Sequence, residues 1–213
     1  MNKLPWKILL KQAIRLIEDT GFKTKRWTLG GGTVLRQYYK HRISNDIDIF
    51  FTDPQIFSYF NPELNDSIIE LTGKYRETTQ SLKLHLVDGD IDLILSKYLT
   101  NVDQEIFEFE GRRIQMEPAA EIAAKKVHYR AEEFTIRDLF DLACIIKNNS
   151  RDLSRPDVKK YFVNKADVLR KRFHTLIPVY EAKANREIDV LEAGKPILKS
   201  APKIVGSYLN NLN

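Results

Sequence analysis

Acidic and apolar residues alternate in two short runs of the first half of the chain, Asp46-Ile-Asp-Ile-Phe50 and Asp90-Ile-Asp-Leu-Ile94. Successive side chains of a β-strand point to opposite faces, so each run predicts a strand with an apolar face and a carboxylate face. Asp46 and Asp48 would then share one face, while Ile47 and Ile49 turn into the core. The chain is therefore expected to contain a sheet that presents paired carboxylates.

Hydrophobic periodicity and turn residues predict the elements in the rest of the chain. Asp88-Gly89, between two alternating runs, is a strong hairpin signal, and Gly21 stands where a helix would end. The expected strands cover residues 27–29, 47–51, 82–87 and 90–95, with a further hairpin over 105–116. The expected helices cover 5–20, 33–40, 65–78, 118–131 and 136–147, followed over 155–213 by helices broken near Pro178, Gly194-Lys195-Pro196 and Pro202.

These elements predict an α/β (α+β) fold followed by a helical part. We expect an α/β core at residues 1–116 and a helical domain at residues 117–213, because from Pro118 the chain becomes rich in Ala, Glu and Lys. With 213 residues, of which 43% are hydrophobic, the chain is long enough to bury such a core.

Composition excludes several classes of protein. No uninterrupted apolar run reaches about 18 residues, which excludes a transmembrane helix. Lys7, Lys11 and Arg15 interrupt the apolar positions of the N-terminal segment, unlike a secretory signal. Cys144 is the single cysteine, so an internal disulfide and a cysteine-rich zinc site are excluded, and its apolar neighbours favour a buried, inert thiol. We expect a cytoplasmic protein without a membrane partner.

A glycine-rich turn precedes the first acidic run. Gly30-Gly31-Gly32-Thr33 follows a short extended segment and opens directly into a predicted helix. Glycines let the backbone approach a phosphate closely, and amides at a helix N-terminus favour an anion. The Thr33 hydroxyl would either donate to the phosphate or cap the helix. The spacing matches neither a Walker A loop nor the Gly-x-Gly-x-x-Gly turn of dinucleotide folds.

Three carboxylates are candidates for a metal site. Asp46 and Asp48 offer two hard anionic ligands on one face, which suits Mg²⁺ completed by water and substrate phosphates. Asp92, on a neighbouring strand, would bridge a metal and orient or deprotonate an attacking hydroxyl. Asp90 shares the face of Asp92 but lies next to the Asp88-Gly89 turn. Each half of the pattern alone is also typical of a tight turn or of a solvent-facing acidic pair.

Taken together, these residues resemble the nucleotidyltransferase superfamily and, more narrowly, the AbiEii/AbiGii toxin family of type IV toxin–antitoxin and abortive-infection systems. The Gly-Gly-Thr turn is similar to this toxin branch, in which Thr33 stands where many nucleotidyltransferases have serine. The resemblance implies a short mixed sheet with flanking helices and a helical C-terminal part. Ser44 would bond a nucleotide phosphate or cap the start of the strand. The family's first motif is matched by Gly31, Gly32, Thr33, Arg42, Ser44, Asp46 and Asp48.

The later family motif is a helix with a lysine, followed by an Arg-Asp pair that opens the next helix. Residues 121–130 and 135–141 match it, so that the resemblance covers residues 30–145. By this resemblance Lys126, together with Arg42, would neutralise triphosphate charge. Arg137 and Asp138, with Asp141, would complete the pocket wall.

The same late residues also fit a purely structural role. Thr135 and Asp138 have the spacing of a capping box, and Arg137 and Asp141 could pair at i,i+4. His41, next to Arg42, is expected to be an exposed loop histidine.

The resemblance implies a Mg²⁺-dependent toxin that transfers a nucleoside monophosphate from a nucleoside triphosphate to an acceptor hydroxyl. Gly31, Gly32 and Thr33 would hold the β- and γ-phosphates, with Asp46, Asp48, Asp92 and Lys126 as catalytic residues. It also implies a separately encoded antitoxin and an RNA acceptor, tRNA at the level of the family. Charge is compatible with RNA, because residues 1–50 hold 10 Lys/Arg against 4 Asp/Glu and residues 151–213 hold 13 against 7.

Three other functions fit the same residues. Residues 51–150 hold 11 Lys/Arg against 18 Asp/Glu, and an acidic pocket would suit a small aminoglycoside acceptor. The metal platform would also serve transfer of the γ-phosphate, as in a kinase-like phosphotransferase. The third alternative is a non-catalytic module that binds a nucleotide or a protein, against which the retention of all three carboxylates argues.

Overall fold

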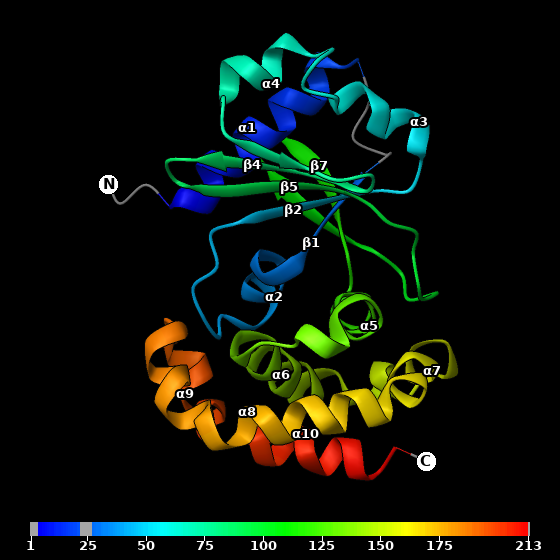
Figure 1. Cartoon of the computed structure of the whole chain (residues 1–213), viewed down its shortest axis with the longest axis vertical. Coiled ribbons are helices and arrows are strands. Elements are labelled where there is room, and N and C mark those ends of the chain that lie inside the picture. Colours follow the sequence, from blue (N-terminus) through cyan, green and yellow to red (C-terminus); the bar gives the residue numbers. More distant parts are fainter. Residues whose placement is uncertain (1–3, 22–26, 213) are drawn as a thin grey trace. The chain divides into compact units, whose positions relative to one another are not determined.

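The computed structural model describes residues 4–21 and 27–212, which form two compact units (Figure 1). Unit 1 comprises Met1–Val34, Ser44–Tyr98 and Gln104–Glu117, and unit 2 comprises Leu35–Ile43, Leu99–Asp103 and Pro118–Asn213. Two short segments that the sequence places in the α/β part, 35–43 and 99–103, thus belong to unit 2. The division into an α/β core at residues 1–116 and a helical domain at residues 117–213 stays a prediction.

Unit 1 is built on a mixed sheet, which in the described residues has seven strands in the order β3-β4-β5-β2-β1-β7-β6. The pairs β2–β5 and β1–β7 are parallel, and the pairs β1–β2, β3–β4, β4–β5 and β6–β7 are antiparallel. This sheet confirms the expected fold class and the strands expected from alternation. The strands are β1 (Trp27–Gly30), β2 (Ile47–Phe51), β3 (Tyr75–Glu77), β4 (Ser81–Leu86), β5 (Gly89–Leu95), β6 (Glu105–Phe109) and β7 (Arg112–Met116).

Both hairpins expected from the sequence are present in the sheet, but the β4–β5 turn lies at residues 87–88, one residue before the predicted Asp88-Gly89. Between β6 and β7, Glu110 and Gly111 have φ angles of 46° and 77°, the left-handed conformation that the tightest hairpin turns require. Between β4 and β5, Leu86 pairs with Gly89 across a two-residue turn. This turn fixes the register of the hairpin, so that Lys83 lies opposite Asp92.

The core of unit 1 lies between the sheet and helix α1 (Pro5–Asp19), which contacts β2 and β5. The helix ends where Gly21 adopts a φ of 78° and its N–H donates to the carbonyl of Glu18 at 2.9 Å. α3 (Pro54–Phe57) and α4 (Asp66–Leu71) lie on the same side of the sheet as α1 (Figure 1). Each Leu or Ile buried in this layer contributes about 1.5–3 kcal/mol. The side chains that α1 buries are Trp6, Leu9, Leu10, Ala13, Ile14, Leu16 and Ile17.

The helix expected over 65–78 is wrong in its second half. Asn65 caps α4 by accepting a hydrogen bond from the Ser67 N–H at 3.0 Å, but the helix stops at Leu71 and Thr72 is extended. Residues 75–77 instead form β3 at the edge of the sheet, where all three side chains are exposed. An exposed edge strand of three residues has no apolar alternation, so the sequence carried no strand signal there.

Unit 2 is helical. α2 (Gly31–Tyr39) begins in unit 1 and continues into unit 2, and residues 99–103 are held in unit 2 because the Leu99 and Thr100 amides each donate to the Glu121 carboxylate at 2.8 Å. Among the residues described, no helix is both long and apolar enough to cross a membrane. The remaining helices are α5 (Ala119–Arg130), η3 (Ala131–Glu133), α6 (Ile136–Leu153), α7 (Pro156–Asn164), α8 (Ala166–Glu187), η4 (Glu192–Gly194), α9 (Lys195–Leu198) and α10 (Ala201–Asn210).

The expected break at Pro178 is wrong. Pro178 lies inside α8, on its exposed side, and the helix continues to Glu187. Buried side chains anchor α8 on both sides of the proline, among them Phe173, Leu176 and Tyr180. Tertiary packing of these residues therefore outweighs the lost backbone hydrogen bond.

Candidate functional site

The carboxylates of β2 and β5 lie together on one face of the sheet in unit 1. Asp48 and Asp92 are direct partners in the parallel pair of strands. Asp46 precedes Asp48 by two residues, and its Oδ1 accepts a hydrogen bond of 3.1 Å from the backbone N–H of Asp90. The apolar residues between them, such as Ile47 and Ile91, are completely buried on the opposite face. The structure thus brings together Asp46, Asp48 and Asp92 from separate extended segments.

The first turn of α2 lies against this carboxylate group. Gly31 has a φ of 66°, and a Cβ atom at this position would overlap the carboxylate of Asp48. At Gly30, a Cβ would likewise meet the Phe50 ring and the Glu117 carboxylate. Position 31 requires a positive φ and no side chain, and only glycine meets both requirements. The Asp48 carboxylate therefore depends on the glycine turn for its space.

The Thr33 hydroxyl takes neither of its two predicted roles, donation to a phosphate or capping of the helix. Its side chain is fully buried, and its hydroxyl donates to the backbone carbonyl of Asp46 at 2.6 Å. The hydroxyl therefore fixes the start of β2 to α2 instead of facing a phosphate. Gly31 and Gly32 at the start of α2 are partly exposed, and Ser44 is half-buried in the segment that leads into β2.

A lysine that is absent from the predicted site lies in the same group of carboxylates. Lys83 Nζ lies 2.5 Å from Asp92 Oδ2 and 3.5 Å from Asp90 Oδ2. His85 Nδ1 lies 2.9 Å from Asp90 Oδ1. The sequence did not signal this contact. The predicted Asp88-Gly89 turn would place position 85 opposite position 92, whereas the observed turn at 87–88 places position 83 there.

The pKa values of the Lys83–Asp92 pair both move upward. Burial lowers the pKa of Lys83, but its hydrogen bond to Asp92 and the charges of Asp92, Asp90 and Asp48 outweigh burial and raise it. Burial raises the pKa of Asp92, and the charges of Asp90 and Asp46 add to this effect beyond what Lys83 offsets. A simple ion pair would lower the pKa of its carboxylate. The rise at Asp92 shows that burial, together with the charges of Asp90 and Asp46, outweighs the lowering effect of Lys83.

The residues fit a hard divalent cation that takes part of its coordination from elsewhere. Among the described residues, no group of three or more His, Cys, Asp or Glu side chains is arranged to hold a metal ion by itself. Mg²⁺ does not require one, because it usually binds one or two carboxylates together with water and substrate phosphates. Asp46 and Asp48 meet this requirement, whereas Asp92 is held by Lys83.

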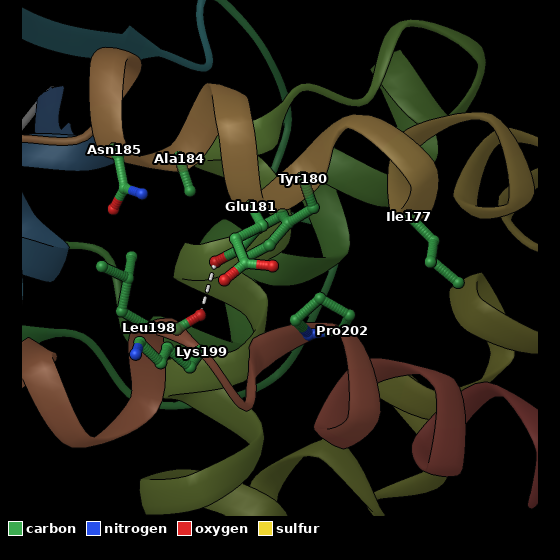
Figure 2. A pocket seen from close by; sticks show the side chains of 8 residues that line it. All are labelled: Ile177, Tyr180, Glu181, Ala184, Asn185, Leu198, Lys199 and Pro202. Atoms are coloured by element: carbon green, nitrogen blue, oxygen red, sulfur yellow. Dashed lines mark hydrogen bonds between the residues drawn. The ribbon is translucent and has the colours of Figure 1, made fainter.

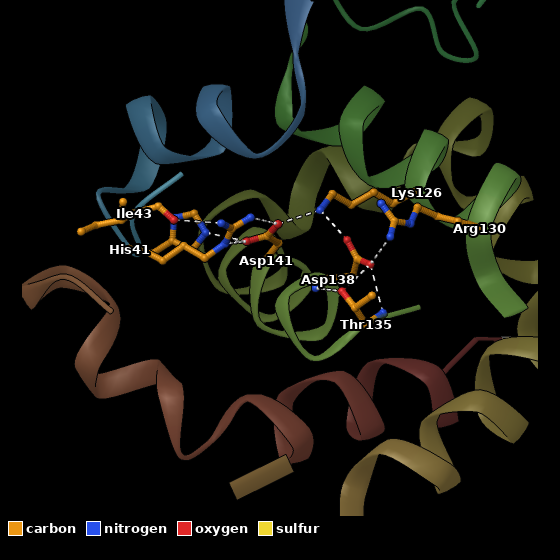
Figure 3. A network of polar contacts seen from close by, with 8 residues as sticks. His41, Ile43, Lys126, Arg130, Thr135, Asp138 and Asp141 are labelled. Atoms are coloured by element: carbon orange, nitrogen blue, oxygen red, sulfur yellow. Dashed lines mark hydrogen bonds and ion pairs between the residues drawn. The ribbon is translucent and has the colours of Figure 1, made fainter. Parts of the chain in front are cut away.

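Unit 2 contains a second cluster of charged residues, centred on Asp141 (Figure 3). Asp141 is completely buried and accepts two hydrogen bonds from the Arg42 guanidinium, at 2.6 and 2.8 Å. His41 Nε2 and Lys126 Nζ also lie 2.8 and 2.7 Å from its carboxylate. Lys126 bridges to Asp138 at 2.7 Å, and Figure 3 shows Asp141 between His41 and Lys126.

The cluster is stabilised by charge. Burial alone would raise the pKa of Asp141, but Lys126, Arg42 and a hydrogen bond from His41 hold it well below its ordinary value. Burial lowers the pKa of Lys126, and the two carboxylates outweigh this and raise it. Both the aspartate and the lysine are therefore held in the ionic state that favours their pairing.

This cluster changes the interpretation of the late motif. Asp138 forms the capping box with Thr135, so the structural role is present. Asp141 pairs with Arg42, whereas Arg137 is exposed on α6. His41 is 1% exposed, and its expected exposed loop position is wrong because Asp141, one hundred residues later, binds it. A local sequence pattern does not predict a contact with a residue so far along the chain.

A separate pocket in unit 2 lies between α8 and the segment that links α9 to α10 (Figure 2). It has a volume of about 220 Å³, and the Tyr180 hydroxyl donates to the Leu198 carbonyl at 3.0 Å at its wall. None of the site residues expected from the sequence lines it. Its residues are Ile177, Tyr180, Glu181, Ala184, Asn185, Leu198, Lys199 and Pro202.

A family model described as "Nucleotidyl transferase AbiEii toxin, Type IV TA system" matches residues 15–200. The chain belongs to the AbiEii family. The match confirms the family expected from the glycine turn and the acidic strands, and it extends well beyond residue 145 into the helices of unit 2. The AbiEii family is a family of nucleotidyltransferase toxins. Its assignment to type IV toxin–antitoxin systems implies an antitoxin partner. No curated protein sequence matches this AbiEii member.

Solved structures resemble the AbiEii chain in fold. The crystal structure of JHP933 from Helicobacter pylori is 16% identical, covers 95% of this chain and 89% of its own, and has a TM-score of 0.50. The solution structure of the antibiotic-resistance factor ANT(2'')-Ia is 14% identical, covers 85% of this chain and 97% of its own, and has a TM-score of 0.47. At such identities, the likeness to JHP933 concerns the fold alone.

Proposed function

We propose that this AbiEii protein is a Mg²⁺-dependent enzyme that transfers a nucleoside monophosphate from a nucleoside triphosphate to a hydroxyl of RNA, with tRNA as the expected acceptor. One observation carries the proposal. The Asp48 carboxylate lies against Gly31 at the start of α2 and beside its register partner Asp92. The helix start that would bind the phosphates and the carboxylates that would hold the metal are thus adjacent, which supports transfer from a triphosphate.

Each site residue of unit 1 would have a specific part in this reaction. Asp46 and Asp48 would hold Mg²⁺, and Asp92 would complete the metal site. The metal, when bound, would neutralise charge that develops on the phosphates. The backbone amides of Gly31, Gly32 and Thr33 would bind the β- and γ-phosphates at the start of α2. Asp92 would align the acceptor hydroxyl and take up its proton, while Ser44 would bind phosphate beside Asp46. The acceptor oxygen bonds to the α-phosphorus and pyrophosphate leaves, so the gain is chiefly from positioning.

The cationic residues of unit 2 are proposed to balance phosphate charge. Lys126 uses two of its three ammonium N–H groups on Asp138 and Asp141, which leaves one donor for an oxygen anion. Arg42, Lys126 and Arg130 face two carboxylates in the cluster, so its net charge is positive. Arg137 and Asp138 would form the wall beside Lys126. Residues 151–213, with 13 Lys/Arg against 7 Asp/Glu, would favour a polyanionic acceptor.

Incubation with nucleotides labelled at the α- or the γ-phosphate, together with total cellular RNA, tests the proposal. The expected result is α-label in RNA, with a preference for the tRNA fraction, in a reaction that EDTA abolishes. Label in RNA only from the γ-position would instead support phosphoryl transfer. Absence of any label in RNA would contradict an RNA acceptor.

The acidic stretch 51–150 favours one second candidate, a small cationic acceptor such as an aminoglycoside. Adding an aminoglycoside to the same reaction separates the two. Release of pyrophosphate that depends on the aminoglycoside and not on RNA would support the small-molecule reaction. Tight nucleotide binding without transfer to either acceptor would support a non-catalytic module.

A further inference from the structure

We propose that Lys83 is the built-in counter-ion of the carboxylate group in unit 1, and that it competes with a divalent cation for Asp92. The inference rests on the proposed metal site at Asp46, Asp48 and Asp92. It adds a positioning residue to that site, one that sets how strongly the protein binds metal before a nucleotide arrives.

The fold holds Lys83 in this place. Its strand neighbours Leu82 and Leu84 are buried on the other face of the sheet, so its side chain points toward the carboxylates. The register places Lys83 directly opposite Asp92. The Lys83 side chain is 34% exposed and that of Asp92 is 15% exposed, so the contact at 2.5 Å is partly shielded from water. Such shielding makes a charged hydrogen bond stronger than one at the surface.

Charge explains why a cation is needed there. Four carboxylates, those of Asp46, Asp48, Asp90 and Asp92, lie on neighbouring positions of β2 and β5. Lys83 contacts two of them and His85 contacts Asp90. Without Lys83, the four negative charges would repel one another at close range. The lysine therefore stabilises the carboxylate group while no metal is bound.

The same contact opposes metal binding. The Asp92 oxygen that accepts the hydrogen bond of the Lys83 ammonium cannot at the same time be a full ligand of a metal ion. A cation that uses this oxygen must displace Lys83, and the cost of breaking the pair lowers its affinity. Nucleotide phosphates supply further oxygens and offset this cost. Lys83 thus favours joint binding of metal and nucleotide over binding of metal alone.

A Mn²⁺ titration without nucleotide, followed by electron paramagnetic resonance, tests the proposal. Lys83→Met removes the charge and keeps the apolar stem, and Lys83→Arg keeps the charge. The matched control is Lys11→Met, which breaks an exposed pair with Glu110 in the same unit. We expect Mn²⁺ to bind about tenfold more tightly to Lys83→Met than to the wild type, since a charged hydrogen bond no longer competes. Lys83→Arg and Lys11→Met are expected to match the wild type.

A double-mutant cycle connects the gain to Asp92. In an Asp92→Asn background, Lys83→Met is expected to give no gain in Mn²⁺ affinity. The melting temperature gives a second readout, because Lys83→Met without metal should melt below the wild type and rise further on adding Mn²⁺. If Lys83→Met fails to fold, a comparison of Asp92→Asn with Asp46→Asn takes its place. Because Lys83 already occupies Asp92, Asp92→Asn should weaken Mn²⁺ binding less than Asp46→Asn does.

The outcomes separate this inference from the proposed function. Equal Mn²⁺ affinity of Lys83→Met and the wild type would overturn the role of Lys83 while leaving the metal site intact. A gain that persists in the Asp92→Asn background would also overturn it. Absence of Mn²⁺ binding in the wild type and in every variant would remove the metal site itself, and with it both proposals.

Discussion

Gly31 and Asp48 lie so close together that a side chain at position 31 would occupy the space of the Asp48 carboxylate. The two residues come from the start of α2 and the middle of β2, and each limits what the other can be. Gly31 also has a positive φ, which adds a backbone requirement to the steric one.

Gly31→Ala is expected to lose nucleotidyl transfer, because the added methyl group displaces Asp48 from its place beside Asp92. Gly111→Ala is the matched control, since Gly111 also has a positive φ but a methyl group added there would meet nothing within 4 Å. Both substitutions should lower the free energy of unfolding by about 1–2 kcal/mol, because alanine is strained in the left-handed backbone conformation. Assays of transfer and urea denaturation check this, and equal activity of the two variants would contradict the role of Gly31.

Asp48→Asn is expected to reduce transfer about hundredfold or more, because a neutral amide is a much weaker ligand for a divalent cation. Asp48 is half-exposed, so the fold should remain, which circular dichroism can verify. Asp88→Asn, in the exposed turn of the same unit, provides the comparison. If Asp48→Asn kept wild-type activity with Mg²⁺, the metal site would be elsewhere.

Asp141→Asn is expected to destabilise the protein by about 3–5 kcal/mol, because it leaves the buried Arg42 without its carboxylate and Lys126 with Asp138 alone. Glu110→Gln, which breaks the exposed pair with Lys11, should change stability by about 0.5 kcal/mol or less. Chemical denaturation measures both. A loss below about 1 kcal/mol for Asp141→Asn would show that the cluster contributes little to stability.

Acid is expected to destabilise the protein through the same cluster. The folded state lowers the pKa of Asp138 and Asp141, so their contribution is complete above the unfolded value of about 3.9 and is lost as the pH falls through the folded values. The free energy of unfolding should therefore decline below about pH 4. Urea denaturation across this range should show a shallower decline for Asp141→Asn than for the wild type.

The Cys144 thiol is expected to be unreactive in the folded protein. It is completely buried, and burial, helped by the charge of Asp141, raises its pKa to about 12. Few thiolates then exist at pH 8, and reagents cannot reach them. Labelling with a disulfide reagent should be about a hundredfold slower or more than in urea. Rapid labelling without urea would indicate that α6 opens locally.

The sequence predicts those parts of the fold in which neighbouring residues carry the signal. Alternation in Asp46–Phe50 predicts β2, and the Asp88-Gly89 turn predicts the β4–β5 hairpin, and both are confirmed. The edge strand β3 has no such pattern, and Pro178 lies in a helix that distant packing maintains.

The candidate site follows the same rule. The pairing of Asp48 with Asp92 could be anticipated from two acidic strands. The contact of Lys83 with Asp92 could not, because the turn lies one residue before the predicted Asp88-Gly89, which changes the residues that face each other across the hairpin. The burial of His41 against Asp141 could not, because it depends on a residue one hundred positions away. The catalytic and metal-binding roles themselves stay predictions.

Unit 2 recruits residues 35–43 and 99–103 from within the sequence of unit 1, which has a consequence for any attempt to divide the chain. No single cut yields both units complete. A fragment that ends at residue 116 would retain His41 and Arg42 but lose the aspartate that binds them, and its counterpart would keep that aspartate beside a cavity. Each of these two fragments, when it is expressed alone, should therefore be unstable.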